Sequence, residues 1–259
     1  MNQVEKAKEN GFLLTPVKNA RVKSSTPLLA GTIKGATVYS HTMLKGDVNS
    51  CAAAPSILKT FFLFEGAISI ESGSGKNTLG ERASYTANPD EDLKISSDAY
   101  SHFIEIQWSL SKDDRQFLAN QKVSFPMIQI YDDCSQYRED FKSPKTISRS
   151  IIGHHALPRF CMGSCESNGP DRINPHAHPY VDQFFYSFPE NDINLLIDDK
   201  VQPLEGNTIF YIPLGSNHGV DVPEGKRMHY IWIDFITDPR GVEYLDEVHI
   251  PTGVKEQVT

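Results

Sequence analysis

Long apolar runs are missing from this chain of 259 residues. No stretch approaches the roughly 20 apolar residues that a helix needs to span a bilayer, so no membrane partner is expected. The charged N-terminal segment MNQVEKAKENGF has no apolar segment behind it, and no secretory signal is expected either. The four cysteines are Cys51, Cys134, Cys161 and Cys165. They follow no disulfide-framework spacing, which favours a reducing, cytoplasmic setting.

An excess of basic residues is also absent. The formal net charge is -8 at pH 7, which argues against nucleic acid or an anionic membrane as the main partner. A small-molecule substrate is the partner we expect. Helical periodicity is scarce as well. One short helix is predicted within 111–120, SKDDRQFLAN, with Ser111 as its N-cap, and no helix-turn-helix pattern is visible.

Strand-like segments account for most of the remaining pattern. They are rich in aromatic and β-branched residues and are bounded by clusters of Gly, Pro, Asn and Asp, as is typical of strands. The predicted strands are 61–71, 102–110, 125–131, 207–213 and 228–236. Short strands at this spacing predict an all-β protein with a barrel or sandwich architecture.

Two parts of the chain repeat one another in order and approximate spacing. Residues 60–95 and residues 183–220 each begin with an aromatic pair, pass through an alternating strand and a polar turn, and end with an aromatic strand and a Pro-containing loop. A duplicated barrel unit is the economical interpretation. A polar stretch within 111–150 indicates the boundary, which we place between an N-terminal domain of 1–125 and a C-terminal domain of 126–259.

The residues that carry chemistry lie in the second repeat. His176 and His178 alternate along NPHAHPYVDQFFYSF, so on a β-strand both side chains would face the same side and enter a barrel. Gln183 begins the next aromatic strand, and His218 follows a tight Pro-Leu-Gly turn. Three neutral imidazoles and one carbonyl oxygen predict a site for a single divalent transition metal, which could be Fe, Mn, Zn, Ni or Cu.

These motifs resemble those of the cupin superfamily. Its first motif has a Gly, then His-x-His and a Glu, and its second has a Gly, a short strand and Pro-x-Gly-x-x-His. The matching residues are Gly169, His176, His178, Gln183, Gly206, Pro213, Gly215 and His218. The resemblance implies two tandem cupin barrels of the double-stranded β-helix, or jelly-roll, type. The first motif departs from the family twice, because Gln183 stands where Glu is usual and Glu190 stands where a second Gly would be.

Two positions compete for the fourth ligand. Three residues separate Asp182 from His178, and four separate Gln183 from it. In cupins the acidic ligand immediately precedes an apolar run, which favours Gln183 and leaves Asp182 on the other face of the strand. The alternative for the whole site is a degenerate cupin that binds no metal.

The first repeat has no imidazole at the corresponding positions. Aligning the aromatic pairs and the Pro-containing loops places other residues there, namely Ala53, Pro55, Thr60 and Asp92. The N-terminal cupin is therefore expected to be structural, or a partner surface, without a metal of its own. We interpret His41 and His102 as ordinary strand-end histidines.

Two histidines and two arginines lie near the motif strand. Neighbouring strand positions face opposite ways, so at most one of His154 and His155 could approach the site, and a loop role is favoured for them. Arg159 and Arg172 are candidates for binding a substrate carboxylate through paired hydrogen bonds. A surface salt bridge would also explain either arginine.

Several aromatic residues of the second repeat could line the cavity, although core packing explains them equally well. They are Tyr180, Tyr186, Tyr211, Tyr230 and Trp232. We take Tyr186 and Tyr230 as candidates for substrate contacts. The catalytic base has no assigned position, and Asp182 and Tyr211 are its candidates.

The ligand set indicates a type of chemistry. A divalent ion with four neutral ligands keeps its full positive charge and polarises a bound carbonyl or hydroxyl more strongly than one with a carboxylate ligand. The leading hypothesis is a Lewis-acid isomerase or lyase acting on a small oxygenated substrate, such as a sugar acid or keto acid. A metal-dependent dioxygenase or decarboxylase is the second reading, and a non-catalytic small-molecule binding protein is the third. A homodimer is a mild preference.

Overall fold

Two compact units make up the chain. The computed structural model describes residues 2–17 and 21–258. One unit consists of residues 18–133, and the other combines residues 134–259 with residues 1–17. Among the described residues, no helix has the length and apolar character needed to cross a bilayer.

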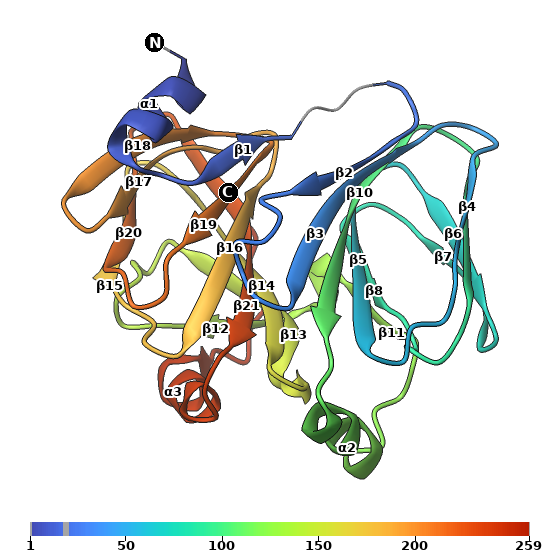
Figure 1. The fold of residues 1–259 in the computed structure, drawn as a ribbon. Coiled ribbons are helices and arrows are strands. Elements are labelled where there is room, and N and C mark those ends of the chain that lie inside the picture. The colour runs from blue at the N-terminus through green and yellow to red at the C-terminus, as the bar shows by residue number, and fades with distance from the viewer. Residues whose placement is uncertain (1, 18–20, 259) are drawn as a thin grey trace. The chain divides into compact units, whose positions relative to one another are not determined.

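The N-terminal unit contains two antiparallel sheets and helices at its C-terminal end (Figure 1). Its elements are β2 (Ser24–Leu28), β3 (Ala36–Met43), β4 (Val48–Cys51), β5 (Ile57–Glu65), β6 (Ile68–Ser72), β7 (Gly75–Leu79), β8 (Ala83–Thr86), β9 (Leu93–Ser97), β10 (Ser101–Ser109), α2 (Lys112–Asn120), β11 (Met127–Ile130) and η1 (Tyr131–Asp133). One sheet has the order β11-β8-β5-β10-β3-β2, and the other has the order β4-β9-β6-β7. Phe61, Tyr85 and Phe103 pack in the core between them.

The C-terminal unit repeats this plan with longer additions (Figure 1). Its elements are α1 (Gln3–Asn10), β1 (Leu14–Pro16), β12 (Ser135–Arg138), β13 (Ile147–Leu157), β14 (Phe160–Asn168), β15 (Asp171–His176), β16 (Val181–Ser187), β17 (Asp192–Ile197), β18 (Lys200–Glu205), β19 (Thr208–Ile212), β20 (His218–Val222), β21 (Arg227–Ile236), α3 (Arg240–Val248) and β22 (Ile250–Pro251). The larger sheet has the order β1-β19-β16-β21-β14-β13-β12-β22, and the smaller one has the order β15-β20-β17-β18.

The two units are duplicates at the level of strand register. β5 lies between β8 and β10 as β16 lies between β19 and β21, and β9 lies between β4 and β6 as β20 lies between β15 and β17. Phe61 pairs with Tyr85 in the first unit, and Phe184 pairs with Tyr211 in the second. The alignment made from the aromatic pairs is therefore also the structural alignment, and the all-β tandem-barrel prediction is confirmed.

The division of the chain differs from the expected cut between residues 125 and 126. β11 follows that cut, yet it forms the edge of the first unit's sheet by pairing with β8. β1 precedes the whole first unit, yet it pairs with β19 at the corresponding edge of the second. The first barrel thus includes a strand that follows the expected boundary, and the second includes a strand that precedes the whole first unit. A single cut in the sequence cannot describe both units.

Local sequence signals explain several elements. The predicted helix is confirmed as α2, where Ser111 accepts from the amide of Asp114 and Asp114 accepts from the amide of Ser111 in a capping box. Helix α1 has the same reciprocal cap between Asn2 and Glu5, and the sequence prediction missed it. The predicted strand 61–71 is two strands, β5 and β6, divided by a turn.

Two motif glycines have clear structural reasons. Gly215 has φ +75° in the turn between β19 and β20, a conformation that other residues rarely adopt. Gly206 lies against the backbone of β16's exit loop, where an added Cβ would sit 2.1 Å from the carbonyl oxygen of Pro189. These positions shape the approach to the strand that begins with His218.

We expect Gly206→Ala to destabilise the C-terminal unit by about 1–3 kcal/mol, because backbone atoms cannot rotate away from the new methyl group. Gly153→Ala is the matched control, since its Cβ would meet only Ser150 Oγ at 3.8 Å. Thermal unfolding measures the loss, and hydrogen exchange in β18 and β19 locates it. Equal stability of the two variants would contradict the close approach at Gly206.

Candidate metal centre

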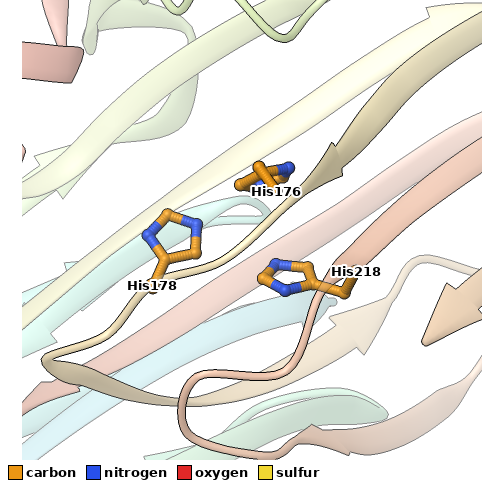
Figure 2. Close-up of side chains that lie close together, drawn as sticks. All are labelled: His176, His178 and His218. Atoms are coloured by element: carbon orange, nitrogen blue, oxygen red, sulfur yellow. The ribbon is translucent and has the colours of Figure 1, made fainter. Parts of the chain in front are cut away.

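The three motif histidines meet in a cavity inside the C-terminal barrel. His176 ends β15, His218 begins β20, and the two residues are strand partners. His178 lies in the connection between β15 and β16, so it reaches the cavity from a loop and not by strand alternation as expected. Figure 2 shows the three rings gathered from these two segments.

The rings are close enough to share one ion. Their centroids lie 4.9 Å apart for His176 and His178, 4.5 Å for His176 and His218, and 5.3 Å for His178 and His218. One nitrogen from each ring lies within 4.8 Å of the other two. Phe141 stacks on the ring of His176 at 3.7 Å and limits its rotation.

Backbone carbonyls determine which nitrogen of two rings carries the proton. His176 Nδ1 donates to the carbonyl of Asn174 at 2.9 Å, and His218 Nδ1 donates to that of Ser216 at 3.2 Å. Both rings therefore present the lone pair of Nε2 to the cavity, in the manner of metal-binding histidines. His218 Nε2 is buried without a hydrogen-bond partner among the described residues, and the same is true of His178 Nδ1.

All three imidazoles are neutral at physiological pH. Burial lowers the pKa of His176 to about 4, and burial together with the nearby His176 ring lowers that of His218 to about 3. Burial and the two neighbouring imidazoles hold the pKa of His178 well below its usual range. Neutral imidazole is the form that binds a metal ion.

Gln183 lines the same cavity as these histidines, with its amide orientation set by a carboxylate. Its Nε2 donates a hydrogen bond to Asp234 Oδ1 at 2.9 Å. The amide oxygen, Oε1, is buried and has no hydrogen-bond partner among the described residues. Burial raises the pKa of Asp234 to about 8, against the opposing effect of the Gln183 amide. The alternative ligand Asp182 lies on the other strand face and accepts from Tyr211 Oη at 2.9 Å.

The residues present therefore fit a divalent transition metal. Two imidazole nitrogens and one amide oxygen are buried, lack partners among the described residues, and line one cavity with His176. A buried polar atom left without a partner costs about 1–3 kcal/mol, so such a group requires an explanation. A cation bound by His176, His178, Gln183 and His218 supplies one.

The rest of the cavity lining combines polar and aromatic side chains. The cavity volume is about 30 Å³, which is room for about two water-sized groups. Lys142 Nζ forms an ion pair with Glu139 and donates to Cys165 Sγ at 3.1 Å. Burial disfavours both charges, but Lys142 and His249 lower the pKa of Glu139 to about 2, and Cys165 together with Glu139 raises the pKa of Lys142. The aromatic lining includes Tyr230 and Trp232.

Several predicted site residues do not line this cavity. Tyr211 borders a separate surface pocket beside Leu13, and Asp182 is bonded to it. Tyr186 is buried, but on the face of β16 opposite Gln183. Arg172 is exposed and lies 3.5 Å from Asp221, which is the surface salt bridge that was the alternative.

Arg159 is placed in the hairpin turn between β13 and β14 with φ +55°, away from the cavity lining. Of the residues predicted to contact substrate or to act as base, Tyr230 lines the cavity. Sequence reasoning missed Lys142, Glu139 and Asp234. For Asp234 a signal was present, because it is the one carboxylate within the aromatic segment MHYIWIDFI.

The first barrel holds different residues at the corresponding points. Thr60 occupies the position of Gln183, and its Oγ1 lies 3.0 Å from that of Thr86. Ile106 faces Thr60 across the sheet, where Asp234 faces Gln183 in the second barrel. Asp92 accepts from the amide of Ala53 at 2.8 Å.

His41 and His102 are buried near strand ends, since His102 is the second residue of β10 and His41 lies two residues before the end of β3. His41 Nε2 lies 2.9 Å from Glu105 Oε2, and His102 Nε2 lies 3.2 Å from Ser40 Oγ. Burial lowers the pKa of His102 to about 4. Both histidines are thus core residues with polar neighbours.

Comparison with solved structures agrees with this architecture. No family model matches the chain, and no curated protein matches its sequence. A putative glyoxylate induced protein from Pseudomonas aeruginosa is 11% identical, with 83% of this chain and 80% of that one covered and a TM-score of 0.69. Oxalate decarboxylase from Lactobacillus farciminis is 9% identical, with 87% and 86% covered and a TM-score of 0.66.

A third similar structure is described as a cupin. The cupin 2 conserved barrel domain protein from Leptotrichia buccalis is 14% identical, with 85% of this chain and 91% of that one covered and a TM-score of 0.56. At such identities a likeness establishes the fold. The chain therefore has the cupin fold, in the form of two tandem barrels.

The Gln183–Asp234 pair generates a prediction. In metal-free protein, Gln183→Glu places a second buried carboxylate beside Asp234, and we expect it to destabilise the fold by about 1–3 kcal/mol because like charges cannot both ionise there. The double variant Gln183→Glu/Asp234→Asn restores the pairing and should recover most of the loss. Urea unfolding in the presence of a chelator measures both, and an unaffected Gln183→Glu protein would contradict the pairing.

Proposed function

We propose that the C-terminal barrel is a metal-dependent enzyme of Lewis-acid type, acting on a small oxygenated substrate as an isomerase or lyase. The observation that carries this proposal is the convergence of buried polar atoms without a hydrogen-bond partner, from His178, Gln183 and His218, on one cavity with His176. A bound divalent ion would supply polarisation of a substrate carbonyl or hydroxyl. The protein's own residues hold the ligands in the required protonation state and orientation.

Asp234 also affects the charge of the site, although it is not one of the four proposed ligands. Asp234 accepts from the Gln183 amide, so a carboxylate stands one hydrogen bond behind the ligand oxygen. When ionised, Asp234 polarises the amide and increases the negative charge on Oε1. Because the pKa of Asp234 is raised to about 8 in the metal-free protein, this charge would be supplied only where a bound cation favours the ionised carboxylate.

The cavity volume restricts the substrate class. A space of about 30 Å³ holds about two water-sized groups, so the reacting part of the substrate must be compact. Trp232 and Phe185 line the cavity.

Tyr230 is the polar group we assign to the substrate. Burial raises the pKa of its phenol, so the hydroxyl keeps its proton and donates to a substrate oxygen. Its ring stacks on Phe185 at a centroid distance of 4.8 Å, which fixes its position. Lys142 is already engaged by Glu139, Cys165 and Ser148, and its role is to stabilise the polar part of the cavity lining.

A metal-dependent decarboxylase or dioxygenase is the second candidate. Asp234 behind Gln183 would favour it where the carboxyl is ionised, because added negative charge near the ligands stabilises a higher oxidation state. One of the similar structures is an oxalate decarboxylase.

Metal-loaded protein should exchange solvent deuterium into two- to four-carbon keto acids without consuming oxygen. His218→Ala removes a buried ligand and should reduce the exchange rate to background. The measurement is proton NMR of the substrate alongside an oxygen electrode, with Fe(II), Mn(II) and Zn(II) compared. Oxygen uptake that His218→Ala abolishes would favour the second candidate, and binding of substrates without turnover would favour a binding protein.

Tyr230→Phe should lower kcat by about 100-fold or more while metal content is kept, because the variant loses one proton donor but none of the ligands. Tyr211→Phe is the matched control, since Tyr211 bonds Asp182 outside the cavity and its removal should leave kcat unchanged. Equal turnover of the two variants would remove Tyr230 from the mechanism.

A further inference from the structure

A second group of metal-binding side chains lies on the outside of the C-terminal unit. His154 and His155 belong to β13, and Asp246 belongs to α3. His154 Nε2 lies 2.9 Å from Asp246 Oδ1, and His155 Nε2 lies 2.7 Å from the same oxygen. Two imidazoles therefore converge on one carboxylate oxygen.

A bulge in β13 explains how adjacent residues point the same way. Ile152 pairs with Met162 and Leu157 pairs with Phe160, so four residues of β13 face a single residue of β14. Strand alternation does not hold across such a bulge. The expectation that His154 and His155 face opposite ways is wrong for this reason, and their ring centroids lie 4.6 Å apart.

We propose that His154, His155 and Asp246 form a second binding site for a divalent transition ion of the zinc, nickel or copper type. Two imidazole nitrogens and one carboxylate oxygen suit these ions, and one ligand atom from each residue lies within 4.8 Å of the others. The ion replaces the protons that the two rings now share with Asp246. His155 and Asp246 are exposed, so water completes the coordination.

This site shares no residue with the buried centre, but it lies beside the wall of that cavity. The ring of His249 lies 5.7 Å from the ring of His154, and its Nε2 lies 3.3 Å from Glu139 Oε1. His249 and Tyr137 line both the buried cavity and a surface pocket that contains His154 and His155. An ion bound here would cross-link α3 to β13 next to this wall.

Counting bound zinc tests the proposal. Metal-free wild-type protein titrated with Zn(II), followed by calorimetry and by metal analysis after gel filtration, should bind two equivalents. His155→Ala and Asp246→Asn should each bind one, and His218→Ala should also bind one through the surface site. Glu247→Gln, which changes an exposed carboxylate next to Asp246 on α3, is the matched control and should bind two.

The zinc titration tests the surface site and the buried site separately. One equivalent in the wild type that His218→Ala abolishes would overturn the surface site and leave the buried one intact. A second equivalent that survives both His155→Ala and Asp246→Asn would also overturn it. One equivalent that His155→Ala abolishes and His218→Ala does not would support the surface site and contradict the buried one. His155 is 66% exposed, so its replacement should not disturb folding.

Discussion

The buried amide of Gln183 has one carboxylate to donate to, Asp234, and this hydrogen bond decides which end of the amide faces the cavity. Because Nε2 is hydrogen-bonded to Asp234, the oxygen of the amide lines the same cavity as the unpartnered ring nitrogens of His178 and His218. An acceptor atom in such a space needs a donor or a cation. The three imidazoles are neutral. A cation beside the three histidines and Gln183 would therefore meet neutral ligand atoms and no competing proton.

The sequence was informative where the signal was local. The alternating His176 and His178, and the turn before His218, identify cavity residues because each motif is contained in a few neighbouring positions. Asp234 could not be placed in this way. It lies 51 positions from Gln183 and meets it only through the register between β16 and β21. Contacts across a sheet depend on that register, which composition and periodicity leave open.

Irregular backbone accounts for the other differences. Strand parity correctly put Asp182 on the face opposite Gln183, but it failed for His154 and His155 because a bulge interrupts β13. It also does not apply to His178, which follows the end of β15. Aromatic content predicted strands well, yet it could not separate Tyr230, which faces the cavity, from Tyr186, which faces away. Both functional clusters thus include positions where regular alternation stops.

The first barrel has the same fold as the second but lacks the residues of the proposed metal site. Its sheets have the same strand order and register, but Thr60 bonds Thr86 and Ile106 replaces the orienting carboxylate. The ligand and its orienting partner are thus both absent there. Since this barrel forms without them, the unpartnered atoms of the second barrel do not stabilise the fold. Three such atoms cost about 3–9 kcal/mol together, which is comparable to the net stability of a domain. The cation proposed for this cavity would offset that cost, and its binding would then be thermodynamically linked to the stability of the second barrel.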